Sequence, residues 1–188
     1  MGMPQTVERW TAERVKALPA DGNRYECVDG ELLVTPAPRP RHQVALLALL
    51  RHLDAYLSEH RFGDALLSPA DIELDDETLV QPDLFVLPQG ESRRLKTWKD
   101  VSRLLLAVEV LSPSTARADR IIKRRRYQRA GVPEYWVVDL DARLIERWRP
   151  GDERPELLSD TLFWQPDPAQ PALNLDLAAL FADTAPQA

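Results

Sequence analysis

The sequence predicts an α/β domain in which helices pack against a mixed central β-sheet, with a β-hairpin near the N-terminus. An Asp-Gly pair separates two strand-like segments, residues 24–28 and 31–35, and is typical of a tight hairpin turn because both turn residues take positive φ. Strand-like runs then alternate with helical patterns. Residues 104–111 are apolar enough to form a strand that is covered on both faces.

Helices are predicted where apolar residues recur at helical spacing or where breakers end a run. A short helix is expected at residues 11–18. A longer helix at residues 42–59 is amphipathic and buried on one side, as indicated by the spacing of Leu46, Leu50, Leu53 and Leu57. A further helix, residues 115–130, ends at Gly131 and Pro133, which act as a C-terminal cap and a breaker.

The remaining segments are strand-like. After the hairpin, strands are expected at residues 67–74, 82–87, 104–111, 134–140 and 144–148, with residues 141–143 as the turn between the last two. A strand near residues 162–164 and a short helix near residues 177–181 close the chain.

A length of 188 residues corresponds to one domain at about 150 residues per domain. We expect an N-terminal arm and helix in residues 1–20 and the core of the fold in residues 21–150. The C-terminal strand, loops and short helix, residues 151–188, are expected to pack on this core.

Composition excludes several classes of protein. The 24 Lys and Arg residues against 30 Asp and Glu residues leave a net charge of −6, which rules out a uniformly basic nucleic-acid coat but allows a local basic patch. With Cys27 as the only cysteine, no intrachain disulfide or cysteine-built zinc site can form. No apolar run reaches the length of a membrane span, and the N-terminus lacks an apolar signal core, so we expect a cytoplasmic protein with no membrane association.

Glu109 is the most informative residue, because it interrupts the apolar strand at residues 104–111. A buried carboxylate is costly unless it is paired or binds metal. Asp83 lies in a similar position at the start of another strand. Two carboxylates that converge from one sheet can bind Mg²⁺ or Mn²⁺. From the residues alone, a pair of purely structural carboxylates is equally well supported.

The helix after Glu109 supplies cations. Between Arg117 and Arg129 there are seven basic residues and one acidic residue. Lys123 lies on the same helix face as Asp119, so we expect it to point at the carboxylates. Four arginines are predicted to contact nucleic-acid phosphates: Arg120, Arg124, Arg125 and Arg126. The alternative for each arginine is a solvated basic helix.

Several segments, taken in order, resemble the Uma-type family of restriction endonucleases within the PD-(D/E)xK nuclease superfamily. They are residues 25–31, Arg41-His42-Gln43, Pro82-Asp83, residues 109–114, Asp119 with Lys123 and Tyr127, and residues 131–139. The resemblance runs from about residue 20 to residue 150 and implies a restriction-endonuclease-like fold. It also implies a metal-dependent endonuclease that hydrolyses DNA.

The resemblance implies a role for each matching residue. Asp83 and Glu109 would bind Mg²⁺ or Mn²⁺, and Lys123 would orient or help deprotonate the attacking water. The sequence departs from the superfamily at Leu111, where the lysine usually stands. In the resembling family the lysine comes from the following helix, which here means Lys123.

Five residues are secondary candidates. Glu26 is either an acid of the site or a solvent-facing charge on an edge strand. His42 is expected to cap its helix, with contact to a phosphate or a ligating carboxylate as the alternative. Asp71 belongs either to a second metal site or to an exposed acidic loop. Asp119 and Tyr127 share a helix face with the predicted catalytic lysine.

Three functions are therefore open. The first is a DNA endonuclease that works as a homodimer, because two symmetric copies can cut both strands of a duplex. The second is a catalytically inactive nuclease-fold module that binds nucleic acid or a protein. The third is a metal-dependent hydrolase of small phosphoesters, which would show weak nucleic-acid affinity that is insensitive to salt.

Overall fold

The computed structural model describes residues 9–184 and contains three β-sheets. The central sheet has six strands in the order β10 (Glu156–Leu158), β9 (Leu144–Trp148), β8 (Tyr135–Asp139), β7 (Leu106–Val110), β6 (Leu84–Pro88) and β3 (Gly63–Leu67). Strands β7 and β8 are parallel and every other neighbouring pair is antiparallel. The predicted mixed sheet is therefore confirmed.

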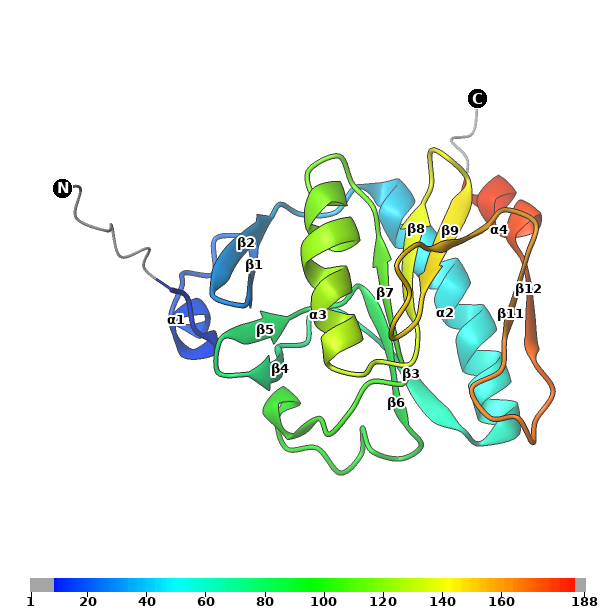
Figure 1. Ribbon diagram of the computed structural model, residues 1–188, viewed down its shortest axis with the longest axis horizontal. Coiled ribbons are helices and arrows are strands. Elements are labelled where there is room, and N and C mark those ends of the chain that lie inside the picture. The colour runs from blue at the N-terminus through cyan, green and yellow to red at the C-terminus, as the bar shows by residue number, and fades with distance from the viewer. Residues whose placement is uncertain (1–8, 185–188) are drawn as a thin grey trace.

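A four-stranded antiparallel sheet lies beside the central one (Figure 1). Its strand order is β2 (Glu31–Thr35), β1 (Arg24–Val28), β5 (Thr78–Val80) and β4 (Ile72–Asp75). The short helix α1 (Ala12–Lys16) buries Ala12 and Val15 against this sheet. The predicted hairpin is β1–β2, and its turn residues Asp29 and Gly30 have φ of 52° and 82°. This is the conformation that the Asp-Gly pair predicts.

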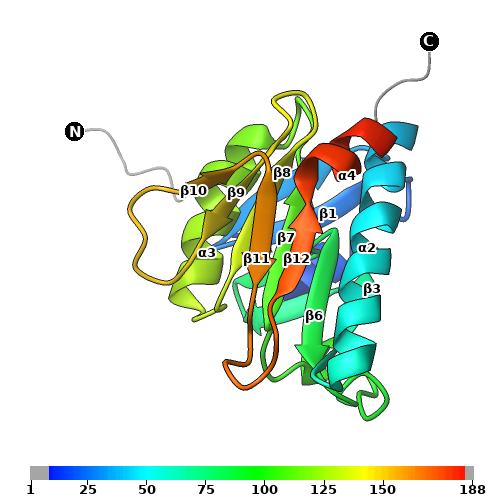
Figure 2. The ribbon, with the colours of Figure 1, turned by 90° about the vertical axis from the view of Figure 1, so that its right-hand side faces the viewer.

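Helices cover both faces of the central sheet (Figure 2). On one face lie α2 (Pro40–His60), α4 (Leu177–Asp183) and the two-stranded sheet of β11 (Thr161–Trp164) and β12 (Leu173–Asp176). On the other face lies a continuous helical segment made of a π-helix (Ala118–Lys123) and α3 (Arg124–Arg129). A 3₁₀ turn, Trp98–Asp100, precedes β7.

Alternation along β7 decides which side chains reach which layer. Leu106, Val108 and Val110 pack in the core beneath α2. Ala107 packs on the opposite face, beneath α3, and Glu109 has the same parity as Ala107. The carboxylate predicted from the sequence is thus directed at the basic helix.

One predicted strand, residues 67–74, is wrong. Strand β3 ends at Leu67 and belongs to the central sheet, whereas β4 begins at Ile72 and belongs to the small sheet. The chain crosses between the sheets at Ser68–Pro69, where proline has no N–H for a ladder. Much of the expected acidic loop is therefore strand β4. The sequence reading also missed the short strands β5, β10 and β12.

The remaining elements lie within a few residues of their expected positions, although the expected arm at residues 1–8 lies outside the described part of the chain. None of the helices formed within residues 9–184 is both long enough and apolar enough to cross a membrane.

The packing of α2 gives a first prediction. Leu53 is fully buried in the core, whereas Leu47 on the same helix is 45% exposed. We expect Leu53→Ala to lower the free energy of unfolding by about 2–5 kcal/mol, because it leaves a cavity. Leu47→Ala is the matched control and should change it by less than about 0.5 kcal/mol. Urea unfolding of both variants measures this difference, and equal losses would contradict the assigned helix face.

Candidate functional site

Asp83 and Glu109 face each other across two neighbouring strands. In the antiparallel pair β6–β7, Leu84 is opposite Val108. Continuing this register by one residue brings Asp83 opposite Glu109, and directly opposed side chains lie on the same face of a sheet. Both carboxylates are almost completely buried, with 2% and 1% of their surface exposed. The structure therefore brings together the two acids that the sequence singled out.

Asp83 is paired at both oxygens. Its Oδ1 accepts a hydrogen bond of 2.7 Å from Nη1 of Arg24. Its Oδ2 lies 2.9 Å from Nε2 of His42 and accepts a bond of 2.9 Å from the backbone N–H of Val110. Burial alone would raise the pKa of Asp83, but the contacts with His42 and Arg24 outweigh it and lower the pKa below its ordinary value.

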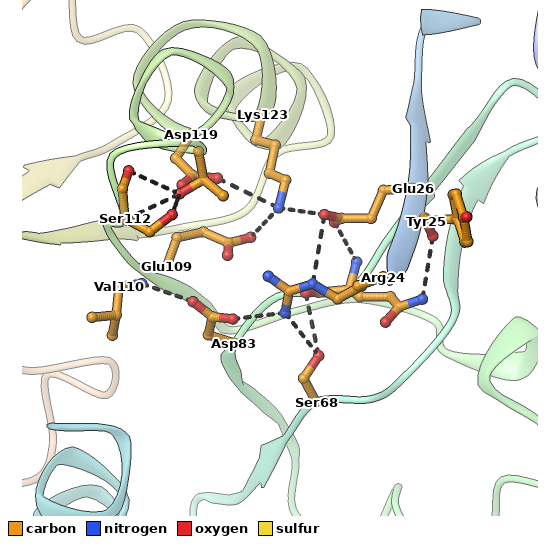
Figure 3. A network of polar contacts seen from close by, with 12 residues as sticks. Arg24, Tyr25, Glu26, Ser68, Asp83, Glu109, Val110, Ser112, Asp119 and Lys123 are labelled. Carbon is orange, nitrogen blue, oxygen red and sulfur yellow. Dashed lines mark hydrogen bonds and ion pairs between the residues drawn. The ribbon is translucent and has the colours of Figure 1, made fainter. Parts of the chain in front are cut away.

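Lys123 is a buried ammonium group surrounded by three carboxylates (Figure 3). Its Nζ lies 2.8 Å from Oε2 of Glu26, 3.0 Å from Oε1 of Glu109 and 3.4 Å from Oδ1 of Asp119. Burial would lower the pKa of Lys123, but the charges of these acids raise it well above its ordinary value. The amine is therefore protonated at neutral pH.

The helix that carries Lys123 has π-helical turns from Ala118 to Lys123. Such turns widen the helix locally and are frequent at functional sites. Asp119 and Lys123 are both buried on the face that contacts the sheet, as their spacing predicts. Tyr135 anchors the same turn by donating a hydrogen bond of 3.0 Å to the carbonyl of Asp119.

Glu26 enters the site from β1 and is fully buried, so the solvent-facing alternative is wrong. Its Oε1 accepts a bond of 2.7 Å from the backbone N–H of Gln81. The side-chain amide of Gln81 in turn donates 2.7 Å to Oδ1 of Asp71. Asp71 is thus connected to Glu26 through Gln81 rather than by direct contact.

His42 and Tyr127 differ from their simplest sequence readings. The expected helix cap by His42 is not formed: the N-cap residue of α2 is Arg39, and the imidazole contacts Asp83 instead. Tyr127 is completely buried, and its hydroxyl has no hydrogen-bond partner within residues 9–184. Burial and then the charge of Glu109 raise the pKa of Tyr127.

The cluster carries more negative than positive charge. Four buried carboxylates, those of Glu26, Asp83, Glu109 and Asp119, are balanced by two cations, Lys123 and Arg24. The excess is two negative charges. Burial, only partly offset by Lys123, raises the pKa of Glu109 well above its ordinary value, and neighbouring acids raise it further. Without another cation, the folded protein lowers this excess by binding protons.

The site opens to solvent beside Asp83. Within the cluster, the side chains of Arg24 and His42 are 20% and 12% exposed, whereas the carboxylates are at most 3% exposed. A substrate would therefore meet Arg24 and His42 first. Sequence reading missed Arg24, although it precedes Glu26 by two residues and therefore lies on the same face of β1.

The four arginines predicted to contact nucleic acid have different surroundings. Arg120 binds Glu146 and Asp139 at 2.6 and 2.8 Å, so its guanidinium is engaged within the chain. Arg126 is 8% exposed and binds Asp75 at 2.6 Å.

Of the other two, Arg124 is half-buried and Arg125 is exposed. Arg124 lies over the ring of Trp148, 4.6 Å from the centroid. Arg125 is exposed and lines a groove of about 690 Å³ together with Arg129, Asp29 and Ile121. Of the four, Arg125 is the best placed for an external phosphate.

The donor set fits a divalent metal ion. Among residues 9–184, no group of three or more His, Cys, Asp or Glu side chains is arranged to hold a metal. Magnesium, however, is usually held by one or two carboxylates, with water or substrate phosphate completing its shell. Asp83 and Glu109 supply hard oxygen ligands, and a divalent cation would neutralise the excess of two charges. Glu109 bonds Lys123 through one oxygen, and Figure 3 shows its other oxygen directed away from the amine.

A solved structure shares this architecture. It is the crystal structure of "a putative nuclease belonging to DUF820" from Anabaena variabilis ATCC 29413 at 1.96 Å resolution. The similarity has a TM-score of 0.69 at 17% sequence identity and covers 94% of this chain and 99% of that chain. The chain therefore has the α/β fold of that structure, with the mixed central sheet and the N-terminal hairpin sheet.

The family follows from the sequence match. The model of the Uma2 family, described as "Putative restriction endonuclease", matches residues 12–178. The chain belongs to this family, and the resemblance seen in the sequence is confirmed. No curated protein matches the chain.

The burial of Lys123 gives a second prediction. Lys123→Met should lower the free energy of unfolding by about 3–5 kcal/mol, because it leaves three buried carboxylates without their cation. Lys99→Met is the matched control: this amine is 69% exposed and lies 3.6 Å from Glu73, so its loss should cost about 1 kcal/mol or less. Urea unfolding without divalent metal measures both variants. Equal losses would contradict the central role of the amine.

The pKa of Glu109 gives a third prediction. Because this pKa is raised on folding, the folded protein binds more protons than the unfolded chain above the ordinary value of 4.5, and its stability falls as pH rises through that window. Glu109→Gln has no such loss. Its melting temperature in EDTA should therefore exceed that of the wild type by more at pH 8 than at pH 5, with about 2–4 °C for each kcal/mol.

The exposed Glu153 supplies the matched control for this comparison. Glu153→Gln should melt with the wild type at both pH values. If Glu109→Gln is less stable than the wild type at pH 8, the negative charge of Glu109 is already neutralised by neighbouring groups without a metal ion.

Proposed function

We propose that this chain is a metal-dependent endonuclease that hydrolyses phosphodiester bonds of DNA. The observation that carries the proposal is the pairing of Asp83 with Glu109 across β6 and β7, with Lys123 held 3.0 Å from Glu109. Family membership supports the reaction class, and the excess of two negative charges supports a divalent cofactor.

In this proposal Asp83 and Glu109 hold Mg²⁺ or Mn²⁺. When bound, such an ion lowers the pKa of water and stabilises developing charge on phosphate oxygens. Lys123 stays protonated, so it acts as a donor that orients the attacking water and offsets charge on the phosphorane. Of the two roles expected for this lysine, orientation is favoured over deprotonation by the raised pKa of Lys123.

Substrate approaches from the side of Arg24 and His42, where the site meets solvent. The exposed Arg125 on α3 supplies further positive charge. A homodimer would place two such sites on opposite strands of a duplex. We therefore expect double-strand breaks, rather than nicks alone, at protein concentrations at which the dimer forms.

One observation favours a second function. Both oxygens of Asp83 are already bonded within the chain, as expected of a catalytically inactive module that keeps the nuclease fold and binds nucleic acid or a protein. Metal dependence separates the two functions. A purely structural cluster gains no stability from Mn²⁺.

Cleavage of supercoiled plasmid tests the proposal. Wild-type protein should convert plasmid to relaxed and linear forms with Mg²⁺ or Mn²⁺ and should be inactive in EDTA. Asp83→Asn and Glu109→Gln should lower the rate by about a hundredfold or more, because each removes a charged ligand of the ion on which the reaction depends.

Asp54→Asn and Glu153→Gln make the same chemical changes at exposed positions and should cleave like the wild type. Metal-dependent cutting of a small phosphodiester without cutting of plasmid would favour the small-phosphoester hydrolase. Cleavage in EDTA, or undiminished cleavage by Asp83→Asn, would refute the proposed site.

A further inference from the structure

Arg24 occupies the carboxylate that the proposed function assigns to the metal. Its Nη1 donates 2.7 Å to Oδ1 of Asp83 and 3.3 Å to Oγ of Ser68 (Figure 3). The other oxygen of Asp83 is bonded to His42 and to the backbone of Val110. The backbone bond is fixed by the sheet. Among the described residues Oδ1 accepts one hydrogen bond, so a cation that binds this oxygen lies beside the guanidinium and competes with it.

Charge favours the guanidinium as the group that leaves. A divalent ion next to Asp83 repels Arg24, because a guanidinium is always charged, whereas an imidazole carries no permanent charge. Replacing one positive charge by two at the same carboxylate also reduces the negative excess of the cluster. The exchange is therefore favourable for the cluster, although Arg24 must find new partners.

The position of Arg24 allows it to move without leaving the site. Its side chain is 20% exposed and starts at the first residue of β1, at the edge where the buried carboxylates meet solvent. Its Nε is buried without a hydrogen-bond partner among the described residues, so one donor is already unused. Ser68 Oγ already accepts a hydrogen bond of 3.3 Å from Nη1 and can keep this contact.

A guanidinium released at this edge is suited to a phosphate. Its donors form a planar fork that matches two phosphate oxygens. Of the described acids that interact with Arg24, Asp83 and Glu109 would be occupied by the ion, and Glu26 lies 4.0 Å from Nε. The substrate phosphate would arrive at the same edge. Metal binding and phosphate binding would then be coupled through one side chain.

We propose that Arg24 is the resident cation of the metal site: it pairs with Asp83 in the metal-free protein, is displaced from that carboxylate when the divalent ion binds, and then binds the substrate phosphate. This inference rests on the proposed function, since it takes Asp83 as a metal ligand. In the absence of substrate, Arg24 competes with the metal ion for Asp83 and so weakens metal binding. When a substrate phosphate binds the guanidinium, this competition is relieved and metal binding becomes stronger.

The test measures metal affinity and cleavage separately on Arg24→Gln. Calorimetric titration with Mn²⁺ in the absence of DNA should show an affinity about tenfold or more above that of the wild type, because a competing positive charge is gone. At saturating Mn²⁺ the same variant should cleave plasmid at least about tenfold more slowly, because a charge-assisted phosphate contact is lost. Opposite changes in the two quantities are not expected from a merely structural arginine.

Two further variants make the test specific. Arg24→Lys keeps the charge but loses the fork, so we expect Mn²⁺ affinity within about threefold of the wild type together with slow cleavage. Arg51→Gln changes an exposed arginine on α2 and should alter neither quantity. Circular dichroism and melting temperature establish that each variant is folded. Arg24→Met, which removes the same charge, replaces Arg24→Gln if the latter does not fold.

The outcomes separate this inference from the proposed function. If the wild type binds Mn²⁺ and Arg24→Gln binds it equally or more weakly, the displacement is refuted and the metal site stands. If only Arg24→Gln binds Mn²⁺, the displacement is supported in its strongest form. If neither binds, both the inference and the metal-dependent function are refuted. Undiminished cleavage by metal-saturated Arg24→Gln or Arg24→Lys would refute the phosphate contact.

Discussion

The structure around the site depends on the neutralisation of one buried ammonium group. Lys123 is almost completely buried, so its charge must be balanced by nearby acids. Glu26 comes from the small sheet, Glu109 from the central sheet and Asp119 from the same helix. The ion pairs thus join three separately formed elements at one point. The helix can dock on the sheet only in the position that completes this arrangement.

A cluster with this composition is not the most stable one available. Two cations would balance two carboxylates, yet four carboxylates are buried, and the raised pKa values of Glu109 and Asp119 reflect the resulting cost. Apolar residues of similar size would often be at least as stable in such positions. Such an imbalance is what the proposed binding of an external cation requires, because stability is given up where a ligand supplies the missing charge.

The sequence indicated the site residues that are unusual among their neighbours in the chain. It did not indicate the residues whose importance depends on contacts between segments far apart in the sequence. Glu109 is conspicuous within an apolar strand, and Lys123 within a regular helical spacing. Arg24 and Gln81 are ordinary polar residues near the ends of strands, and their importance follows from the contacts of the small sheet with Asp83 and Glu26. The two-sheet arrangement itself was missed because Ser68–Pro69 joins β3 and β4 within one short segment for which the sequence predicts a single strand.

The replacement of lysine by Leu111 is explained by the layer that Leu111 faces. Leu111 packs in the core beneath α3, and Glu109, two residues earlier, has the same parity. A lysine there would have to bend back from the end of the strand toward Glu109, whereas Lys123 approaches the same carboxylate from the overlying helix. Moving the amine to the helix allows Leu111 to contribute apolar packing. It also makes helix docking a condition for assembling the site, so a chain in which the helix has not docked lacks the amine of the proposed site.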